Sequence, residues 1–231
     1  MRRLIIVLFV LGLMFVVVDR VAVVAVQREM AARAQTGAGL NARPDVVIRG
    51  FPFLTQAIRG RYDHIEVSLG DVSRGDIELR DVRLELHDVR APLSSLLDQN
   101  RQLQPQAQTV QAFAVVPYAV VTRSLPHTVL QVRDVRPQGE SLQLTGELTL
   151  AGLPTIPISA TLDISALADA IAIRPSQVDA GPLPSLPVHR ALTITVPVDL
   201  PAGFELSGVR VTRTGLQITG HGRDIVLARV R

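Results

Sequence analysis

The first 26 residues constrain the fold and location of this chain more than any other segment. Two arginines directly after the initial Met precede an uncharged, mostly hydrophobic run from Leu4 to Val18. A helix over this run reaches only about 22 Å at ~1.5 Å per residue, against a membrane hydrocarbon core of about 30 Å. The longer stretch from Leu4 to Val26 can span a membrane if Asp19 and Arg20 lie near the interface. The arginine pair should stay cytoplasmic, which places the rest of the chain outside the cytoplasm.

Two other interpretations of this segment exist. In a cleaved signal peptide, Val23 and Ala25 are the small residues before the cleavage site. A buried core helix is disfavoured by the arginine pair at the start of the run. We favour the uncleaved signal anchor. In both exported forms the following domain is extracytoplasmic, either membrane-bound through a single span or secreted after cleavage.

The domain organisation follows from the residues after the apolar run. Residues 27–35 have a helical composition, and two nearby glycines mark where such a helix ends. The sequence therefore predicts three parts, which are a signal anchor or signal peptide over residues 1–26, a helical stalk or linker over 27–39, and one folded domain over 40–231.

The composition excludes several classes of protein and of site. With 47% hydrophobic and 19% charged residues, the chain is too apolar for a disordered protein. The absence of Cys excludes disulfides, cysteine zinc sites and thiol nucleophiles. Aromatic residues make up 3%, too few for the girdles of membrane barrels or the stacking platforms of single-strand nucleic-acid binders. The formal net charge is only +3, so we expect no nucleic-acid partner despite a pI of about 10.4.

Hydrophobic and polar residues alternate through most of the domain, which is the period-two pattern of half-buried strands. In His64–Leu69, for example, the hydrophobic positions are Ile65, Val67 and Leu69. The pattern recurs at Ile77–Leu79, Val82–Leu86, Leu142–Leu144, Leu148–Leu150, Ile156–Ile164, Leu192–Leu200, Val209–Val211, Leu216–Ile218 and Ile225–Leu227. These segments predict a sheet-dominated, mostly antiparallel domain with one dry face.

A short motif repeatedly shifts the phase of this alternation. It consists of a hydrophobic residue, two polar or small residues, and Val. It occurs at Leu69–Val72, Leu79–Val82, Leu86–Val89, Val132–Val135 and Leu206–Val209. In a regular strand, residues i and i+3 lie on opposite faces of the sheet. Both can face inward only if a bulge or a strand end lies between them, and the sequence does not decide between these two at any of the sites. Bulges at these sites would curve the sheet strongly, as a sheet wrapped around a groove must be.

Two short helices are predicted next to prolines. Pro52 fits the first helical turn and Gly60 the carboxyl cap. The predicted apolar face comprises Phe53, Leu54, Ala57 and Ile58, and the predicted outer face comprises Thr55, Gln56 and Arg59. Pro92 opens a second helix, whose apolar residues are Leu93, Leu96 and Leu97.

Later prolines predict a long irregular connection. They are Pro175, Pro182, Pro184 and Pro187. Taken together, the elements predict the α+β class. A curved, mostly antiparallel sheet wraps around short helices, and a membrane helix precedes it at the amino end.

The sequence contains no catalytic constellation. Its histidines, His64, His87, His127, His189 and His221, are isolated and form no H-x-x-x-H pair. His64 and His87 occupy outward strand positions, where a solvated imidazole is expected. The nucleophile elbow, the P-loop and the dinucleotide-binding glycine motif are absent. We therefore expect no enzyme, no cofactor and no metal site.

Two motifs resemble a known family. The segment Gly50-Phe-Pro-Phe-Leu-Thr-Gln56, with a predicted strand at Asp45–Ile48 before it and Gly60 after it, resembles the signature of the LmeA-like phospholipid-binding family of actinobacteria. A carboxyl-terminal run is similar to that family's closing motif, and it comprises Leu200–Gly203, Leu206, Val209, Val211, Gly215–Ile218 and Gly222. The resemblance covers residues 40–231, and the first motif is the specific one.

The resemblance implies both a fold and a function. The fold is similar to that of tubular lipid-binding (TULIP-like) proteins, in which a curved antiparallel sheet around helical segments leaves an apolar cavity. The function is the binding of phospholipids, anionic phosphatidylinositol-type lipids included, by an exported protein of the cell envelope. Lipid transfer, and support of lipomannan and lipoarabinomannan assembly, are further roles that the resemblance implies.

The helix after Pro52 is the candidate lipid site. We expect its hydrophobic side chains to line the lipid cavity or gate its mouth, and they are Phe51, Phe53, Leu54, Ala57 and Ile58. The candidates for the headgroup phosphate are Arg49, Arg59 and Arg61, because guanidinium groups suit bidentate phosphate contacts. The alternative is core packing for the hydrophobic face and solvation for the arginines.

Three classes of function compete at this point. A phospholipid-binding module is favoured by the aliphatic, aromatic-poor composition and by the resemblance. A structural or interaction protein of the envelope, with a closed core and no lipid ligand, is the alternative. An enzyme acting on envelope glycolipids lacks any catalytic residues that the sequence reveals.

Overall fold

The computed structural model describes residues 2–74, 77–92, 105–124, 130–149, 155–179, 193–198, 200 and 203–226. The chain forms two compact units. The first comprises Met1–Gly70, Arg83–Gln111 and Gly222–Arg231, and the second comprises Asp71–Val82 and Ala112–His221.

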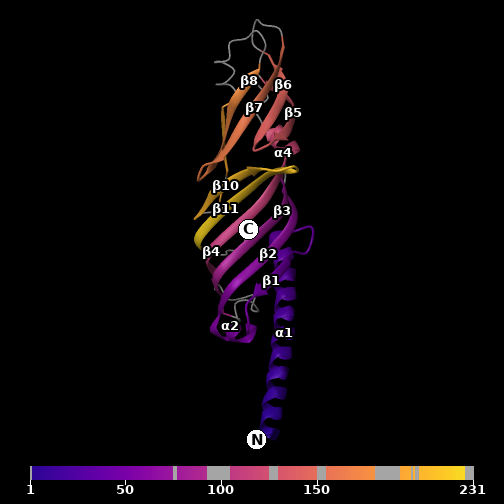
Figure 1. Ribbon diagram of the computed structural model, residues 1–231, viewed down its shortest axis with the longest axis vertical. Helices are drawn as coiled ribbons and strands as arrows, with labels where there is room; N and C mark the ends of the chain where they lie inside the picture. Colours follow the sequence, from indigo (N-terminus) through magenta and orange to yellow (C-terminus); the bar gives the residue numbers. More distant parts are fainter. Residues whose placement is uncertain are drawn as a thin grey trace. The chain divides into compact units, whose positions relative to one another are not determined.

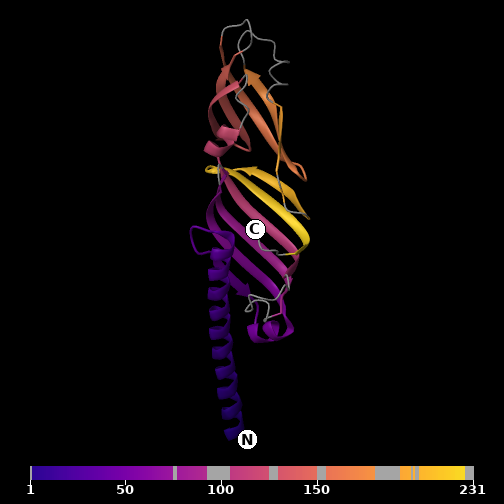
Figure 2. The same ribbon diagram turned by 180° about the vertical axis from the view of Figure 1, so that it is seen from behind.

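The strands form two antiparallel sheets, shown in Figure 1 and from behind in Figure 2. The six-stranded sheet has the order β1 (Asp45–Arg49), β2 (Arg61–Arg74), β3 (Ile77–Arg90), β4 (Gln106–Pro117), β11 (Gly215–Val226) and β10 (Phe204–Val211). The five-stranded sheet has the order β5 (Leu130–Gln138), β6 (Ser141–Leu148), β7 (Ile156–Ala166), β8 (Ala170–Asp179) and β9 (Ile194–Pro197). The helices of the described residues are α1 (Arg2–Ala38), α2 (Phe53–Arg59) and α4 (Tyr118–Ser124). The predicted α+β fold with curved antiparallel sheets and an amino-terminal apolar helix is confirmed.

The phase-shifting motifs lie inside continuous strands, not at strand ends. Two of them place an Asp in the left-handed region within β3, Asp81 at φ 50° and Asp88 at φ 50°. In the motif of β2 it is Gly70 that has the left-handed conformation, at φ 69°. The β5–β6 register shifts between Val132 and Asp134. Asp is among the few non-Gly residues that tolerate this conformation, and such irregularities increase strand twist.

The core of the second unit is aliphatic and follows the predicted alternation. Leu142 and Leu144 of β6 are each 1% exposed. Around them pack buried residues of neighbouring strands, which are Val135, Ile158, Ala160, Leu162, Ile171, Ile173, Leu206 and Leu216. Burial of each large side chain of this kind contributes about 1.5–3 kcal/mol, so alternate positions of β6, β7 and β8 dominate this core.

Helix α1 is exposed over its amino-terminal half and packed over the rest. Figures 1 and 2 show it running beside β1, with its amino end projecting beyond the sheet. From Leu4 to Val18 its large hydrophobic side chains are exposed, whereas Asp19, Val23 and Ala31 are buried. The helix continues without a break through the segment predicted as a stalk. Within the first unit this helix packs beside β1, and Ala31 in the predicted stalk is buried.

Some predictions about elements were incomplete or wrong. Pro175 lies inside strand β8, where the β7–β8 register shifts, and not in an irregular connection. The irregularity absorbs a residue that has no N–H to donate. Strand β4 was not predicted, because its polar residues do not alternate cleanly with its hydrophobic ones. The predicted helix after Pro92 lies outside the described residues, as do Leu150 and Leu227.

Candidate functional site

Helix α2 occupies the corner between β1 and β2, and its ends are set locally. A cis peptide bond joins Phe51 to Pro52, and the helix begins at the next residue. Gly60 ends it in the left-handed conformation at φ 62°, where its N–H donates to the carbonyl of Ala57. The predicted helix between Pro52 and its glycine cap is therefore confirmed, although Pro52 is the extended residue before the first turn and not part of that turn.

The buried face of α2 differs from the predicted one. Its buried residues are Phe53, Gln56 and Ala57, whereas Ile58 is 85% exposed. Gln56 is buried because its side-chain amide has two backbone partners. It donates to the carbonyl oxygen of Arg49 at 3.3 Å and accepts from the N–H of Asp63 at 3.0 Å. The assignment of Ile58 to the inner face and Gln56 to the outer face was wrong.

The five candidate cavity residues separate into two sets. Phe53 and Ala57 are 2% and 4% exposed, and the Phe53 ring lies 6.2 Å from the buried ring of Tyr62. Phe51 and Ile58 face outward, with 60% and 85% of their surface exposed, and Leu54 is half-buried. The structure therefore does not bring these five side chains onto one face of α2.

Asp19 of α1 binds the amino end of α2, a contact that the sequence did not predict. Its side chain is fully buried, and its Oδ1 accepts a hydrogen bond from the backbone N–H of Leu54 at 2.8 Å. Its Oδ2 pairs with the Arg20 guanidinium at 2.6 Å. The Arg20 guanidinium in turn lies 5.2 Å from the centre of the Phe51 ring. The amide N–H groups at the start of a helix have no partner within it, so a carboxylate is a favourable acceptor there.

Arg49, one of the three headgroup candidates, already has a carboxylate partner. It donates two hydrogen bonds to Glu66, from Nε at 2.9 Å and from the terminal nitrogen at 3.0 Å. This bidentate pair holds the pKa of Glu66 below its usual value. A phosphate at Arg49 would have to compete with that carboxylate.

Arg59 and Arg61 lie together at a pocket of about 540 Å³ beside the carboxyl end of α2. Arg90 of β3 joins them, and the remaining lining residues are Ala57, Ile58, Gly60 and Pro92. Ala91 and Gly60 connect the two elements, because the N–H of Ala91 donates to the Gly60 carbonyl at 2.9 Å. Among the described residues, none of the three arginines has an acidic partner. Arg90 could not be predicted as a member of this group, because its proximity to Arg59 and Arg61 depends on where β3 ends.

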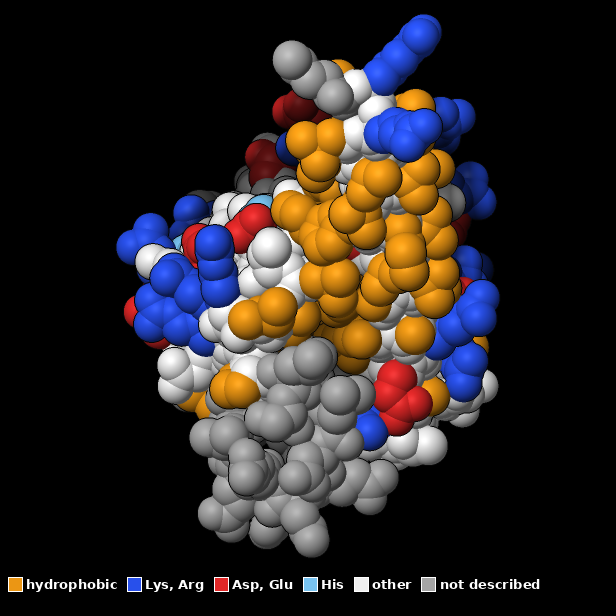
Figure 3. Space-filling model, turned by 90° about the horizontal axis from the view of Figure 1, so that it is seen from below, with side chains coloured by type: hydrophobic (Ala, Val, Ile, Leu, Met, Phe, Trp, Pro, Cys, Tyr) orange, Lys and Arg blue, Asp and Glu red, His pale blue; other side chains and the backbone are white. Residues whose placement is uncertain are grey.

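Hydrophobic side chains gather on the surface at the amino end of α1. Figure 3 shows this face, with a broad hydrophobic area bordered by arginines. The exposed hydrophobic residues of the first unit include those of α1 from Leu4 to Val24 together with Phe51 and Ile58. Helix α1 is long and apolar enough to cross a membrane, with a mean hydropathy of 2.7 in its most apolar window.

The structure also brings together residues that have metal-ligand chemistry. His64, Glu85 and His87 come from neighbouring strands, and their ligand atoms lie within 4.8 Å of one another. Both histidines are half-buried and their rings are stacked, and His64 Nε2 is buried, so the expected solvated imidazole is wrong for His64. Their proximity could not be read from the sequence, because it depends on the register of β2 against β3.

Comparison with known proteins identifies the family. No curated protein and no solved structure matches the chain. The LmeA-like phospholipid-binding family matches residues 17–221, which covers most of the chain. This chain therefore belongs to the LmeA-like phospholipid-binding family.

Proposed function

We propose that this protein is an extracytoplasmic phospholipid-binding protein that an uncleaved α1 holds at the membrane surface. The single observation that carries the membrane-bound form is the hydrogen bond between Asp19 and the N–H of Leu54. Cleavage after Ala25 would remove Asp19 and Val23, both of which are buried against the folded domain. A retained helix keeps these contacts.

The same contact supports a position of the domain at the membrane surface. Asp19 directly follows the exposed apolar run, so the part of α1 available to the bilayer ends where α2 begins. The apolar run from Leu4 to Val18 reaches about 22 Å, several ångströms less than the ~27–30 Å hydrocarbon thickness of a bilayer, a mismatch that local thinning of the bilayer absorbs. Helix α2 then lies at the membrane interface. Its exposed Phe51 and Ile58 would contact the acyl chains of the outer leaflet there, and Arg20 would lie at the headgroups.

The pocket beside α2 is the proposed site for the lipid headgroup. Arg59, Arg61 and Arg90 supply guanidinium groups without carboxylate partners among the described residues, which favours an anionic phospholipid of the phosphatidylinositol type. The acyl chains would dominate the affinity. Each buried methylene contributes ~0.8 kcal/mol, so about ten outweigh the ~1.5–3 kcal/mol of one charged hydrogen bond.

The proposed role is to bind lipid and not to convert it. Presentation or transfer of phospholipid between the membrane and envelope partners fits a lipid site at the membrane interface. Support of envelope lipoglycan assembly is the further role that family membership suggests.

Lipid retention by the full chain tests this function. The protein, purified in a mild detergent and stripped of lipid, is incubated with vesicles of equal phosphatidylglycerol and phosphatidylcholine content. Bound lipid is then extracted and measured by mass spectrometry. We expect retained phospholipid enriched in the anionic species. Replacing Arg59, Arg61 and Arg90 together with Gln should lower that enrichment at least about tenfold, which corresponds to ~1.4 kcal/mol.

Arg49→Gln is the matched control, because Glu66 already occupies that guanidinium. It should leave the lipid ratio unchanged. Ile58→Asp should lower the total lipid retained without unfolding the chain, because the side chain is exposed. A wild-type chain that retains no phospholipid would instead support an envelope protein with a closed core. A triple variant with the wild-type lipid ratio would exclude this pocket as the headgroup site.

A further inference from the structure

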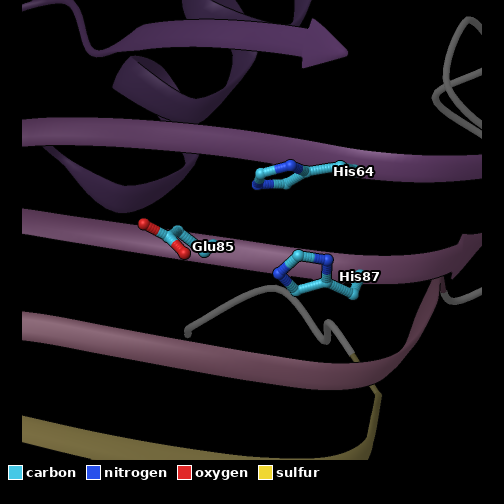
Figure 4. A group of neighbouring side chains, drawn as sticks. All are labelled: His64, Glu85 and His87. Carbon is cyan, nitrogen blue, oxygen red and sulfur yellow. The ribbon is translucent and has the colours of Figure 1, made fainter. Parts of the chain in front are cut away.

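We propose that His64, Glu85 and His87 form a binding site for a divalent transition metal ion of the zinc type. Figure 4 shows the three side chains on β2 and β3, where they lie beside one another on the sheet. Glu85 and His87 are two residues apart on one strand, so they project from the same face. His64 comes from the neighbouring strand, and the three together form a two-strand site that the lipid proposal does not use.

The distances between the ligand atoms fit a metal site whose side chains move closer together when the ion binds. The three ligand atoms lie within 4.8 Å of one another. Bonds of about 2.0–2.1 Å to a tetrahedral ion place its ligands about 3.4 Å apart, so the side chains must bring their ligand atoms closer together when the ion binds. The imidazole rings are stacked, with centroids 4.3 Å apart and planes 24° apart, so the rings must rotate about their side-chain torsions to aim their in-plane nitrogen lone pairs at one ion.

The ligand atoms are free to bind. His64 Nε2 is buried and has no hydrogen-bond partner among the described residues. Its nearest carboxylate oxygen, on Glu66, lies 3.6 Å away, beyond hydrogen-bonding distance. Glu66 is itself held by Arg49, whereas Glu85 has no hydrogen-bond or ion-pair partner among the described residues. An unpartnered buried nitrogen is costly, and a metal bond would satisfy it.

The donor set selects the ion. Two imidazoles and one carboxylate suit Zn²⁺ and the related ions Cu²⁺ and Ni²⁺, whereas Mg²⁺ and Ca²⁺ prefer sites made only of oxygen ligands. Three protein ligands leave a fourth tetrahedral position for water or another ligand. Bound metal would also cross-link β2 to β3.

Zinc binding by the full chain tests the site. The protein is purified without a histidine tag, freed of metal with a chelator, and titrated with ZnCl₂ by calorimetry. The metal content after desalting is measured by mass spectrometry. We expect one Zn²⁺ per chain, a higher melting temperature with Zn²⁺, and no change with Mg²⁺.

Single substitutions separate this site from adventitious binding. His64→Ala and His87→Ala should each remove a metal ligand. Each should therefore weaken zinc binding by more than the ~10–100-fold typical of losing a residue that only hydrogen-bonds to a ligand. Glu85→Gln should weaken it less, because an amide oxygen remains. His221→Ala is the control, since His221 lies 4.0 Å from Glu205 and outside the cluster. If an alanine variant loses stability without zinc, the Gln variant at the same position replaces it.

Two results would overturn the proposal. The first is a wild-type chain that holds no stoichiometric zinc. The second is binding that survives in both histidine variants or that falls equally in His221→Ala. Neither result would bear on lipid retention, which is measured separately on metal-free protein.

Discussion

Phe53→Ala is expected to lower the free energy of unfolding by about 3–5 kcal/mol, the usual cost of removing a buried phenyl ring. Phe53 is 2% exposed and packs against Tyr62, so its removal leaves a cavity at the centre of the α2 corner. For a chain of this length the melting temperature should fall by about 6–20 °C. Thermal unfolding of the full chain in detergent, followed by circular dichroism, measures the change.

Phe51→Ala is the matched control, two residues away on the other side of Pro52. Phe51 is 60% exposed, so its truncation should shift the melting temperature little. Equal destabilisation by the two substitutions would contradict the separation of α2 into an inner and an outer set.

The outward position of Phe51 can be tested separately by fluorescence quenching. The chain contains no Trp, so Phe51→Trp introduces a single reporter. Its fluorescence in vesicles should be quenched by brominated phospholipid if α2 lies at the membrane interface. Phe9→Trp, in the exposed apolar run, serves as the positive control. Quenching at position 9 without quenching at position 51 would exclude contact between Phe51 and the acyl chains.

The sequence was informative where structure is decided locally. Pro52 and Gly60 identify α2 because proline is favoured where a helix begins and glycine where it ends in the left-handed conformation. Alternating residues identify β6 because its inner face is filled with Leu142 and Leu144. These features depend on neighbours within a few positions, which is why pattern and residue type sufficed.

The rest depends on long-range register. Gln56 and Ile58 both fit a plausible face of α2, and the choice rests on backbone groups of β1 and β2 that only the folded chain brings near. The meeting of His64 with His87 likewise depends on how β2 pairs with β3. Asp19 shows the same limit most clearly, since its partner Leu54 is 35 positions away. An acidic residue inside an apolar helix predicts a position at the membrane interface. The sequence alone does not predict that this carboxylate is buried and accepts a hydrogen bond from the N–H of Leu54.

Asp19→Ala is expected to destabilise the full chain by about 2–3 kcal/mol, because hydrogen bonds to charged groups contribute ~1.5–3 kcal/mol and loss of a helix cap about 1 kcal/mol. The substitution leaves the N–H of Leu54 without its acceptor and Arg20 without its partner. Hydrogen exchange should show loss of protection at the Leu54 amide, and thermal unfolding should show the stability change.

Glu29→Ala is the matched control for Asp19→Ala. Glu29 is another α1 carboxylate paired with an arginine, Arg33, at 2.7 Å, but it is 49% exposed. Exposed pairs of this kind contribute about 0.3–0.5 kcal/mol, so this variant should unfold almost as the wild type does. Asp19→Asn retains an oxygen acceptor and should fall between the two. If Asp19→Ala leaves both the stability and the Leu54 amide unchanged in the mature protein, α1 is not docked on α2. The cleaved signal peptide then becomes the correct interpretation of the first 26 residues.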